Sequence, residues 1–148
     1  MALGERTDPY LAHRYRVEID GIVIGGFAEV TGLQAEIETE DYQEGGVSTP
    51  LHKLPKGARQ PNLVLKRGFT EARELWDWHH SSGPGRWTKK LERRTVRIIM
   101  LNSEGGEKLS WRCREAWPVK WSGSDLKGDA NTVAIESLEL AHGGLQRA

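Results

Sequence analysis

The sequence predicts a mainly β protein, an antiparallel β-sandwich or barrel with one inserted α-helix. Several short segments alternate polar and apolar residues with the period of two that half-buried strands show. Gly and Pro separate these segments, and a helical pattern occurs at one place only, about residues 70–81. Because a chain of 148 residues suits one hydrophobic core, we expect a single domain over 1–148.

The N-terminal part predicts three strands, over residues 14–20, 22–31 and 33–40. In the first strand every second residue from Tyr15 to Ile19 is apolar. Paired glycines inside the second strand indicate a bulge or a close approach of backbones. The polar side of the third strand is almost entirely acidic, with Glu36, Glu38 and Glu40, so this side must face water.

Residues 41–59 are expected to form a long loop. They contain Gly45, Gly46, Pro50, Pro55 and Gly57, which are too many strand breakers for a core strand. A connection of this length is unusual in a compact domain and is often functional.

The helix is expected to follow a strand over residues 60–67. Thr70 can cap its start, and Glu71 would meet the positive end of the helix dipole. The helical spacing predicts one buried stripe, made of Ala72, Leu75, Trp76 and His79. Further strands are expected over residues 92–101, 107–115 and 133–142.

Charge and cysteine content exclude several classes of protein. Lys plus Arg and Asp plus Glu both number 21, so no global field favours nucleic acid or an anionic membrane. The single cysteine, Cys113, cannot form an intrachain disulfide and is expected to be a buried structural thiol. The first residues lack the apolar run of a signal peptide, which predicts synthesis in the cytoplasm.

No cluster of residues predicts a catalytic, metal or cofactor site. His79 and His80 are adjacent, so on a helix they diverge by about 100° and do not form a zinc pair. Neither a GxGxxG nor a Walker sequence is present. A basic run from Lys89 to Arg94 follows Trp87 and suits either a phosphate contact or a solvated helix exit. We therefore expect a protein that is not an enzyme.

Five segments together resemble the tail-tube proteins of contractile phages and of extracellular contractile injection systems. They run over nearly the whole chain and read DPYLAHRYRVEIDGIVIGGFAEVTGL, EDYQEGG, LVLKRGFTEARELWDWHH, AWPVKWSGSDL and NTVAIESLELAHGGL. Each segment is a short structural signal, and their order and spacing carry the resemblance.

The resemblance implies a subunit of an inner tube. Six copies would close a ring whose strands join into one barrel around a channel, and the rings would stack. A sheath protein would contract around the tube and drive it into a target, with baseplate, spike and cap proteins as further partners and a possible cargo in the channel. No cofactor is implied, and the tube would belong to a phage tail or to a phage-tail-like particle that can be released.

The resemblance also assigns contact residues. The N-terminal arm, residues 1–12, would order only against a neighbouring copy, and the long loop would reach the adjacent subunit or ring. The expected inter-subunit contacts are Asp8, Tyr10, Tyr42, Glu44, Gly45, Gly46, Leu51 and Leu54. The acidic side chains of Glu36, Glu38 and Glu40 are expected to face the channel.

Three other functions remain open from the sequence. A specialised tube adaptor or initiator at the baseplate would share the same fold. A monomeric ligand-binding β-barrel would also show short antiparallel strands, and it predicts a cavity. A hydrolase or isomerase would need a convergent set of titratable groups, which the sequence does not supply.

Overall fold

The structure is a computed structural model that describes residues 9–22, 26–42, 52–82, 92–129 and 131–148. Its elements in chain order are β1 (Tyr15–Ile19), β2 (Phe27–Thr31), β3 (Glu36–Tyr42), β4 (His52–Arg59), β5 (Leu63–Gly68), α1 (Glu74–Ser82), β6 (Arg94–Leu101), β7 (Glu107–Gly123), β8 (Ile135–Ala141) and β9 (Leu145–Arg147). The named strands pair antiparallel throughout. The predicted antiparallel β fold with one inserted helix is therefore confirmed.

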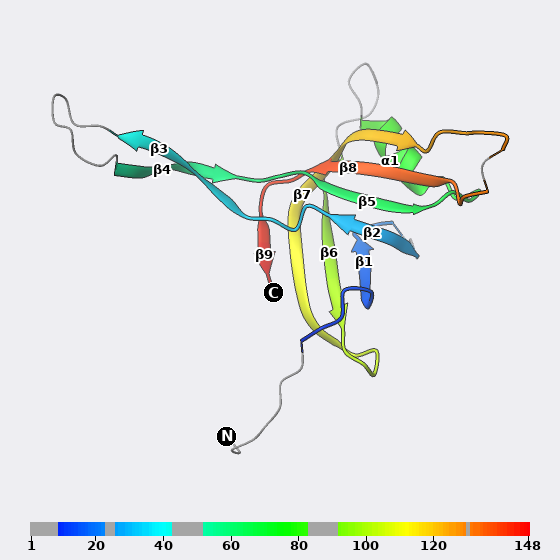
Figure 1. Ribbon diagram of the computed structural model, residues 1–148, viewed down its shortest axis with the longest axis horizontal. Helices are drawn as coiled ribbons and strands as arrows, with labels where there is room; N and C mark the ends of the chain where they lie inside the picture. Colours follow the sequence, from blue (N-terminus) through cyan, green and yellow to red (C-terminus); the bar gives the residue numbers. More distant parts are fainter. Residues whose placement is uncertain (1–8, 23–25, 43–51, 83–91, 130) are drawn as a thin grey trace.

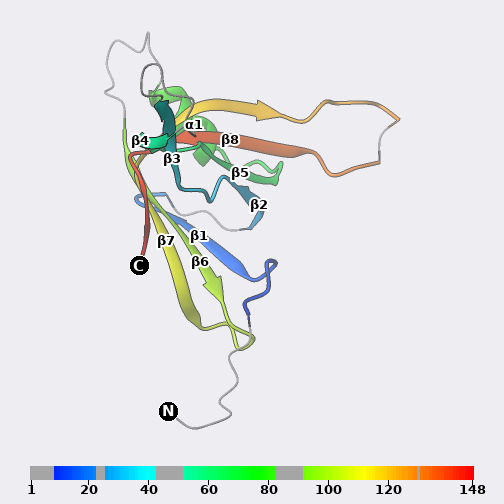
Figure 2. The same cartoon turned by 60° about the vertical axis from the view of Figure 1, so that its left-hand side comes forward.

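The strands form one seven-stranded sheet and a separate two-stranded sheet. The large sheet has the order β1-β6-β7-β8-β5-β2, with β9 also paired to β7, and the small one contains β3 and β4. The long β7 belongs to two layers, because its first half pairs with β6 and β9 and its second half with β8. Figures 1 and 2 show these two layers diverging from β7.

A bulge separates the two halves of β7. Glu115 has a φ of 51°, a backbone region that residues with a side chain rarely adopt. The pairing register with β6 shifts opposite this position, between Arg94 and Val96. Such a bulge bends a strand and increases its twist, which lets β7 leave one layer and enter the other. The predicted strand over 107–115 thus continues to Gly123.

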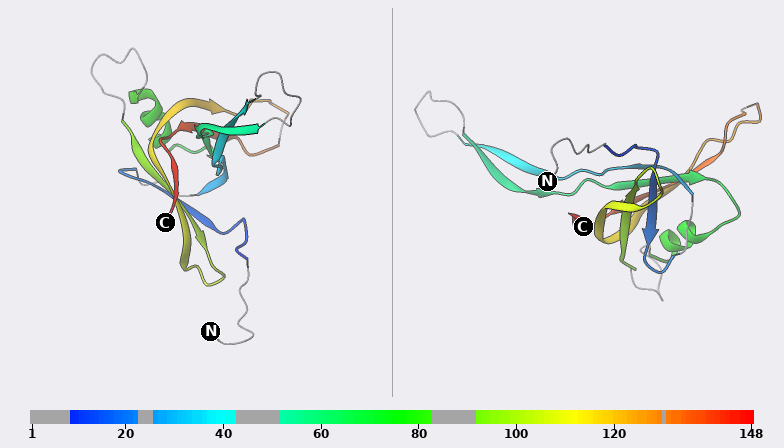
Figure 3. Two further views of the ribbon diagram at one scale, coloured as in Figure 1. Left: turned by 90° about the vertical axis from the view of Figure 1, so that its left-hand side faces the viewer. Right: turned by 90° about the horizontal axis from the view of Figure 1, so that it is seen from below.

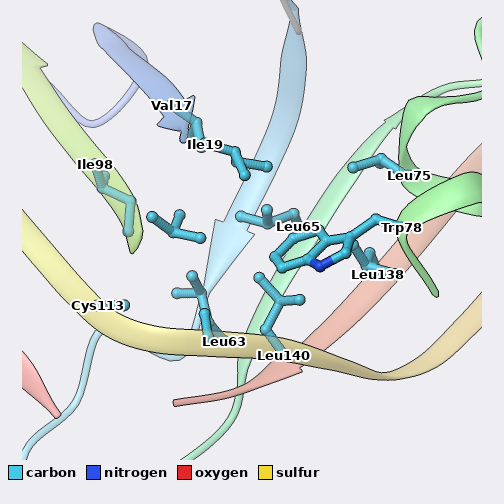
Figure 4. Close-up of a cluster of buried hydrophobic side chains, with 12 residues drawn as sticks. Val17, Ile19, Leu63, Leu65, Leu75, Trp78, Ile98, Cys113, Leu138 and Leu140 are labelled. Carbon is cyan, nitrogen blue, oxygen red and sulfur yellow. The ribbon is translucent and has the colours of Figure 1, made fainter. Parts of the chain in front are cut away.

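The core lies between the two layers and under α1 (Figure 4). Its buried side chains come from five strands and from the helix: Val17, Ile19, Leu63, Leu65, Leu75, Trp78, Val96, Ile98, Cys113, Ala116, Leu138 and Leu140. Burial alternates along β1, β5 and β8, so one row of each strand lies in this core.

The helix is shorter than predicted, and it begins at Glu74 instead of about residue 70. The Thr70 hydroxyl accepts a hydrogen bond from the Ala72 amide at 3.1 Å, which forms a local turn before the helix. The helix buries Leu75 and Trp78, whereas Trp76 is 37% exposed. The predicted stripe was therefore wrong at Ala72 and Trp76, which are both exposed.

The prediction of a loop over residues 41–59 was wrong for its described part. Asp41 and Tyr42 continue β3, and residues 52–59 form β4, which pairs with β3 from Glu36–Arg59 to Tyr42–His52. Gly and Pro did not prevent this strand because β4 pairs with no second strand among the described residues, so Pro55 can lack an amide hydrogen on the open edge. A register shift beside Pro55 also leaves Lys56 unpaired. We call the β3–β4 pair the ribbon.

Candidate functional site

The ribbon projects away from the two layers (Figures 1 and 3). Its described residues are exposed on both faces, including the apolar side chains Ile37, which is 64% exposed, and Leu54, which is 46% exposed. Each face of this projecting element therefore exposes one large apolar side chain with no core beneath it.

The two faces of the ribbon differ in chemistry. Because paired residues share a face, the acidic face carries Glu36, Glu38 and Glu40 from β3, with Arg59, Gly57 and Leu54 opposite them on β4. One weak ion pair occurs on this face, between Glu36 and Arg59 at 3.9 Å. The other face carries Ile37, Thr39 and Asp41 beside Ala58, Pro55 and Lys53.

The structure brings together four of the residues that the sequence selected for contacts or for the channel. Glu36, Glu38, Glu40 and Leu54 lie on the acidic face of the ribbon. Tyr42 ends β3, in register with His52. Tyr10 is exposed and lies far from the ribbon in sequence, in the segment before β1. Outside the described residues lie Asp8, Glu44, Gly45, Gly46 and Leu51.

The four-stranded layer β2-β5-β8-β7 has two open edges. β2 pairs with β5 on one side and with no other named strand on the other. The second half of β7, from Trp117 to Gly123, pairs with β8, while β6 pairs only as far as Ala116. Within the part of the chain that the structure describes, both edges therefore offer unpaired backbone groups, which are a template for another strand.

This layer also has one apolar and one polar face. Leu63, Leu65, Leu138 and Leu140 are buried on the face toward the core. The opposite face carries a row that runs across all four strands: Glu29, Lys66, Ser137 and Ser122. These four side chains help to line one shallow groove, and Lys66 pairs with Glu29 at 3.5 Å. We call this surface the polar face. Its charged and hydroxyl side chains favour contact with water.

A buried ionic cluster joins α1 to the four-stranded layer. Arg67 and Glu136 are 5% and 3% exposed, and the Arg67 Nε donates to Glu136 at 2.5 Å. Arg67 also donates to Glu74 of the helix at 3.2 Å, and the Trp121 indole donates to Glu136 at 3.0 Å. A hydrogen bond from its own backbone amide and a second one from Arg67 lower the pKa of Glu74. Because each buried charge has a partner, the cluster fixes the helix and leaves no free acid or base.

Other candidate reactive groups are structural as well. Cys113 is 1% exposed, and burial raises the pKa of its thiol to about 11, so it is protonated and inert at neutral pH. Burial and the neighbouring His80 lower the pKa of His79. Among the described residues, no group of three or more His, Cys, Asp or Glu could hold a metal ion.

Arg94, the last residue of the basic run from Lys89 to Arg94, has a defined structural role. It donates to the backbone oxygen of Asp20 at 2.6 Å and pairs with Glu92 at 2.5 Å. Its guanidinium also lies 5.8 Å from the ring centre of Trp78. Residues 83–91, which include Trp87, Lys89 and Lys90, lie outside the description. No helix in the described segments is long and apolar enough to span a bilayer.

Sequence reasoning missed one set of charged residues near the C-terminus. Arg112, Arg114 and Arg147 are exposed on β7 and β9, and none of them pairs with an acidic residue within the described segments. The alternation of two arginines around Cys113 was visible in the sequence. The short strand β9, which places Arg147 in register with Trp111 and so on the opposite face, was not predicted.

Solved structures with the same fold come from contractile injection machines. The chain resembles a chain in the tube-terminating cap of the anti-feeding prophage (AFP), with TM-score 0.83 and 19% identity over 100% of this chain and 99% of that one. A chain of the PVC sheath–tube complex in its extended state, an extracellular contractile injection system, matches with TM-score 0.80 and 22% identity over 95% of this chain and 91% of that one. A chain of the six-fold symmetrised AFP baseplate matches with TM-score 0.77 and 22% identity over 97% of each chain.

Sequence comparisons give the family. No curated protein sequence matches the chain. The family model described as "T4-like virus tail tube protein gp19" matches residues 11–146, which covers every strand of the structure except the last residue of β9. The chain therefore belongs to the family of T4-like virus tail tube proteins.

Proposed function

We propose that the chain is the repeating structural subunit of the inner tube of a contractile injection system or phage tail. Six copies form a ring around a channel, and rings stack into a tube that sheath contraction drives into a target. The observation that carries this proposal is the family match together with a four-stranded layer that is open at both edges.

The open edges supply the ring contact. The β2 edge of one copy pairs with the free edge of β7, residues 117–123, in the next copy. Repeating this contact around a closed ring satisfies both open edges of the four-stranded layer in each copy and produces one continuous barrel. Without such a partner, two exposed edges in one domain would favour uncontrolled association.

The polar face supplies the channel lining. Its hydroxyls and its Lys66–Glu29 pair suit an aqueous channel, whereas the opposite face of the same layer is the protein core. We assign the lining to this face in preference to Glu36, Glu38 and Glu40, because those residues lie on a ribbon that projects from the body.

The proposed partners follow from the assemblies in which similar chains occur. Those assemblies are a sheath–tube complex, a terminating cap and a baseplate. We propose sheath, cap and baseplate proteins as partners, with a possible cargo in the channel. Synthesis occurs in the cytoplasm, followed by assembly into a particle. The chain performs no catalytic step in this proposal.

A specialised end subunit is the second candidate function. The likeness to a chain in a terminating cap favours it, since such a subunit keeps the fold and forms one ring without further stacking.

Expression of the chain alone tests the proposal. Light scattering across a range of concentrations measures the mass, and negative-stain electron microscopy shows the particles. Rings that stack into hollow tubes are expected for the repeating subunit, and single rings for the end subunit. A compact monomer at every concentration, with no rings even on a preformed baseplate, would contradict both.

A further inference from the structure

The ribbon carries charge that its own chain does not neutralise. On its acidic face Glu36 has the single distant partner Arg59, and Glu38 and Glu40 have no ion pair with any described residue. Leu54 lies opposite Glu40 and is 46% exposed. This face therefore combines unpaired carboxylates with an uncovered apolar side chain.

A surface of opposite charge lies on β7. Arg112 and Arg147 line a common hollow with Gln146 and Ala148, and Arg114 is exposed one alternation further along β7. Arg112 is in register with Arg97, whose charge Glu18 already neutralises at 2.7 Å. We call Arg112 and Arg114, which share one face of β7, the arginine patch; Arg147 pairs with Trp111 and lies on the other face.

The acidic face and the arginine patch do not meet within one chain. The ribbon extends away from the body, and no ion pair joins it to the patch among the described residues. The chain has equal numbers of acidic and basic residues, so two copies do not repel each other as a whole. Local opposite charges can then fix how one copy lies against the next.

We infer that the acidic face of the ribbon docks on the arginine patch of a second copy of this chain. The contact pairs Glu38 and Glu40 with Arg112 and Arg114 and covers Leu54. The inference rests on the proposed function, and it adds the receiving surface for the ribbon. Since the two surfaces differ, the contact is heterologous and repeats from copy to copy, as a growing tube requires.

Charge reversal tests this contact. One variant carries Glu38→Lys and Glu40→Lys, and a second carries Arg112→Glu and Arg114→Glu. All four residues are exposed, so both variants are expected to keep the circular dichroism spectrum and melting temperature of the parent. Each variant alone is expected to lose tubes in negative-stain images, because like charges then face each other.

Rescue between copies gives the decisive result. In an equal mixture of the two variants, the basic ribbon of the first variant meets the acidic patch of the second. The unchanged acidic ribbon of the second variant meets the unchanged arginine patch of the first, so both contacts again join opposite charges. Tubes are expected to return in this mixture and in the variant with all four changes. As a control, Arg73→Glu with Asp77→Lys reverses an exposed pair on α1 and is expected to leave tubes intact.

The outcomes separate this inference from the proposed function. Parent tubes with unchanged assembly of the Arg112→Glu, Arg114→Glu variant would overturn the inference and leave the tube function standing. The same holds if the two variants lose tubes separately but the mixture and the fourfold variant do not recover them. A parent chain that stays monomeric would contradict both.

Discussion

The four-stranded layer and the ribbon are both made of alternating strands, yet they lie in opposite environments. In the layer, Leu65 and Leu138 are fully buried against the second layer and the helix. In the ribbon, the corresponding apolar residue Ile37 is 64% exposed. Because a two-stranded hairpin is at best marginally stable alone, the layer stabilises the domain, whereas the ribbon is available to bind another chain.

Charged residues show the same contrast. Arg67 and Glu136 are buried, hydrogen-bonded and fixed, and they hold α1 on the layer. On the ribbon, the single ion pair of the acidic face is long and exposed. Exposed pairs contribute little to stability, so the ribbon charges are free to select a partner. Four substitutions measure how far this separation between stability and assembly extends.

The largest loss of stability is expected for Arg67→Met, which leaves the Glu136 carboxylate buried with the Trp121 indole as its remaining donor. Removing one partner of a buried ion pair costs about 3–5 kcal/mol. Urea unfolding followed by tryptophan fluorescence measures the loss. The control Arg73→Met removes an exposed pair with Asp77 and should cost at most ~0.5 kcal/mol. Equal effects of the two variants would show that the buried cluster is unimportant.

Leu65→Ala should have the next largest effect, because it opens a cavity in the core. Truncating a buried leucine costs about 2–5 kcal/mol. Its neighbour Val64 lies on the opposite, partly exposed face of the same strand, so Val64→Ala is expected to cost less than about 1.5 kcal/mol. Thermal unfolding of both variants compares the two faces of β5 directly. A larger loss for Val64→Ala would reverse the assignment of the faces.

Glu74→Gln should have a smaller and pH-dependent effect. The folded-state pKa of Glu74 is lowered below 4.5, so its stabilisation is present above that pH and is lost as the pH falls through the folded value. The side chain is 39% exposed, and the expected loss at neutral pH is therefore below about 1 kcal/mol. Unfolding at about pH 7 and about pH 3 checks the sign. A loss that grows in acid would contradict it.

Leu54→Ala is expected to have the smallest effect on stability and a clear effect on assembly. The side chain is 46% exposed in the free subunit, so the change should stay within about 0.5 kcal/mol. In the proposed contact a second copy covers this side chain, and its truncation should raise the concentration at which tubes form. Light scattering gives this concentration, and urea unfolding gives the stability. A destabilised monomer with normal tubes would reverse the contrast between ribbon and layer.

The sequence predicted the body of the fold better than the ribbon. Strict alternation placed β1 correctly, because one face of this strand is buried and the period of two is imposed by the core. Strands were also expected where β5 and β8 lie, within 60–67 and 133–142. In the ribbon no core imposes a pattern, and Pro55 and Gly57 indicated a loop. Their tolerance depends on the open edge of β4, which local sequence does not reveal.

The candidate site was predicted in part. The acidic stripe Glu36, Glu38 and Glu40 was recognised from its spacing, but its location on a projecting ribbon required the pairing of β3 with β4. The arginine patch was visible as an alternation around Cys113, but its lack of acidic partners depends on which strands lie beside it, β6 and β9. Contacts between strands distant in sequence cannot be read from periodicity, so this surface needed the structure.

Thiol labelling of assembled tubes tests most directly whether the four-stranded layer lines the channel. Ser137→Cys places a thiol on the polar face, and Asp77→Cys places one on α1, on the other side of the layer. Cys113 gives a low background because its thiol is buried, with a pKa of about 11. A small maleimide should label both variants, whereas a polymer-linked maleimide too large for the channel should label Asp77→Cys alone. Equal labelling of Ser137→Cys by both reagents in intact tubes would contradict the account.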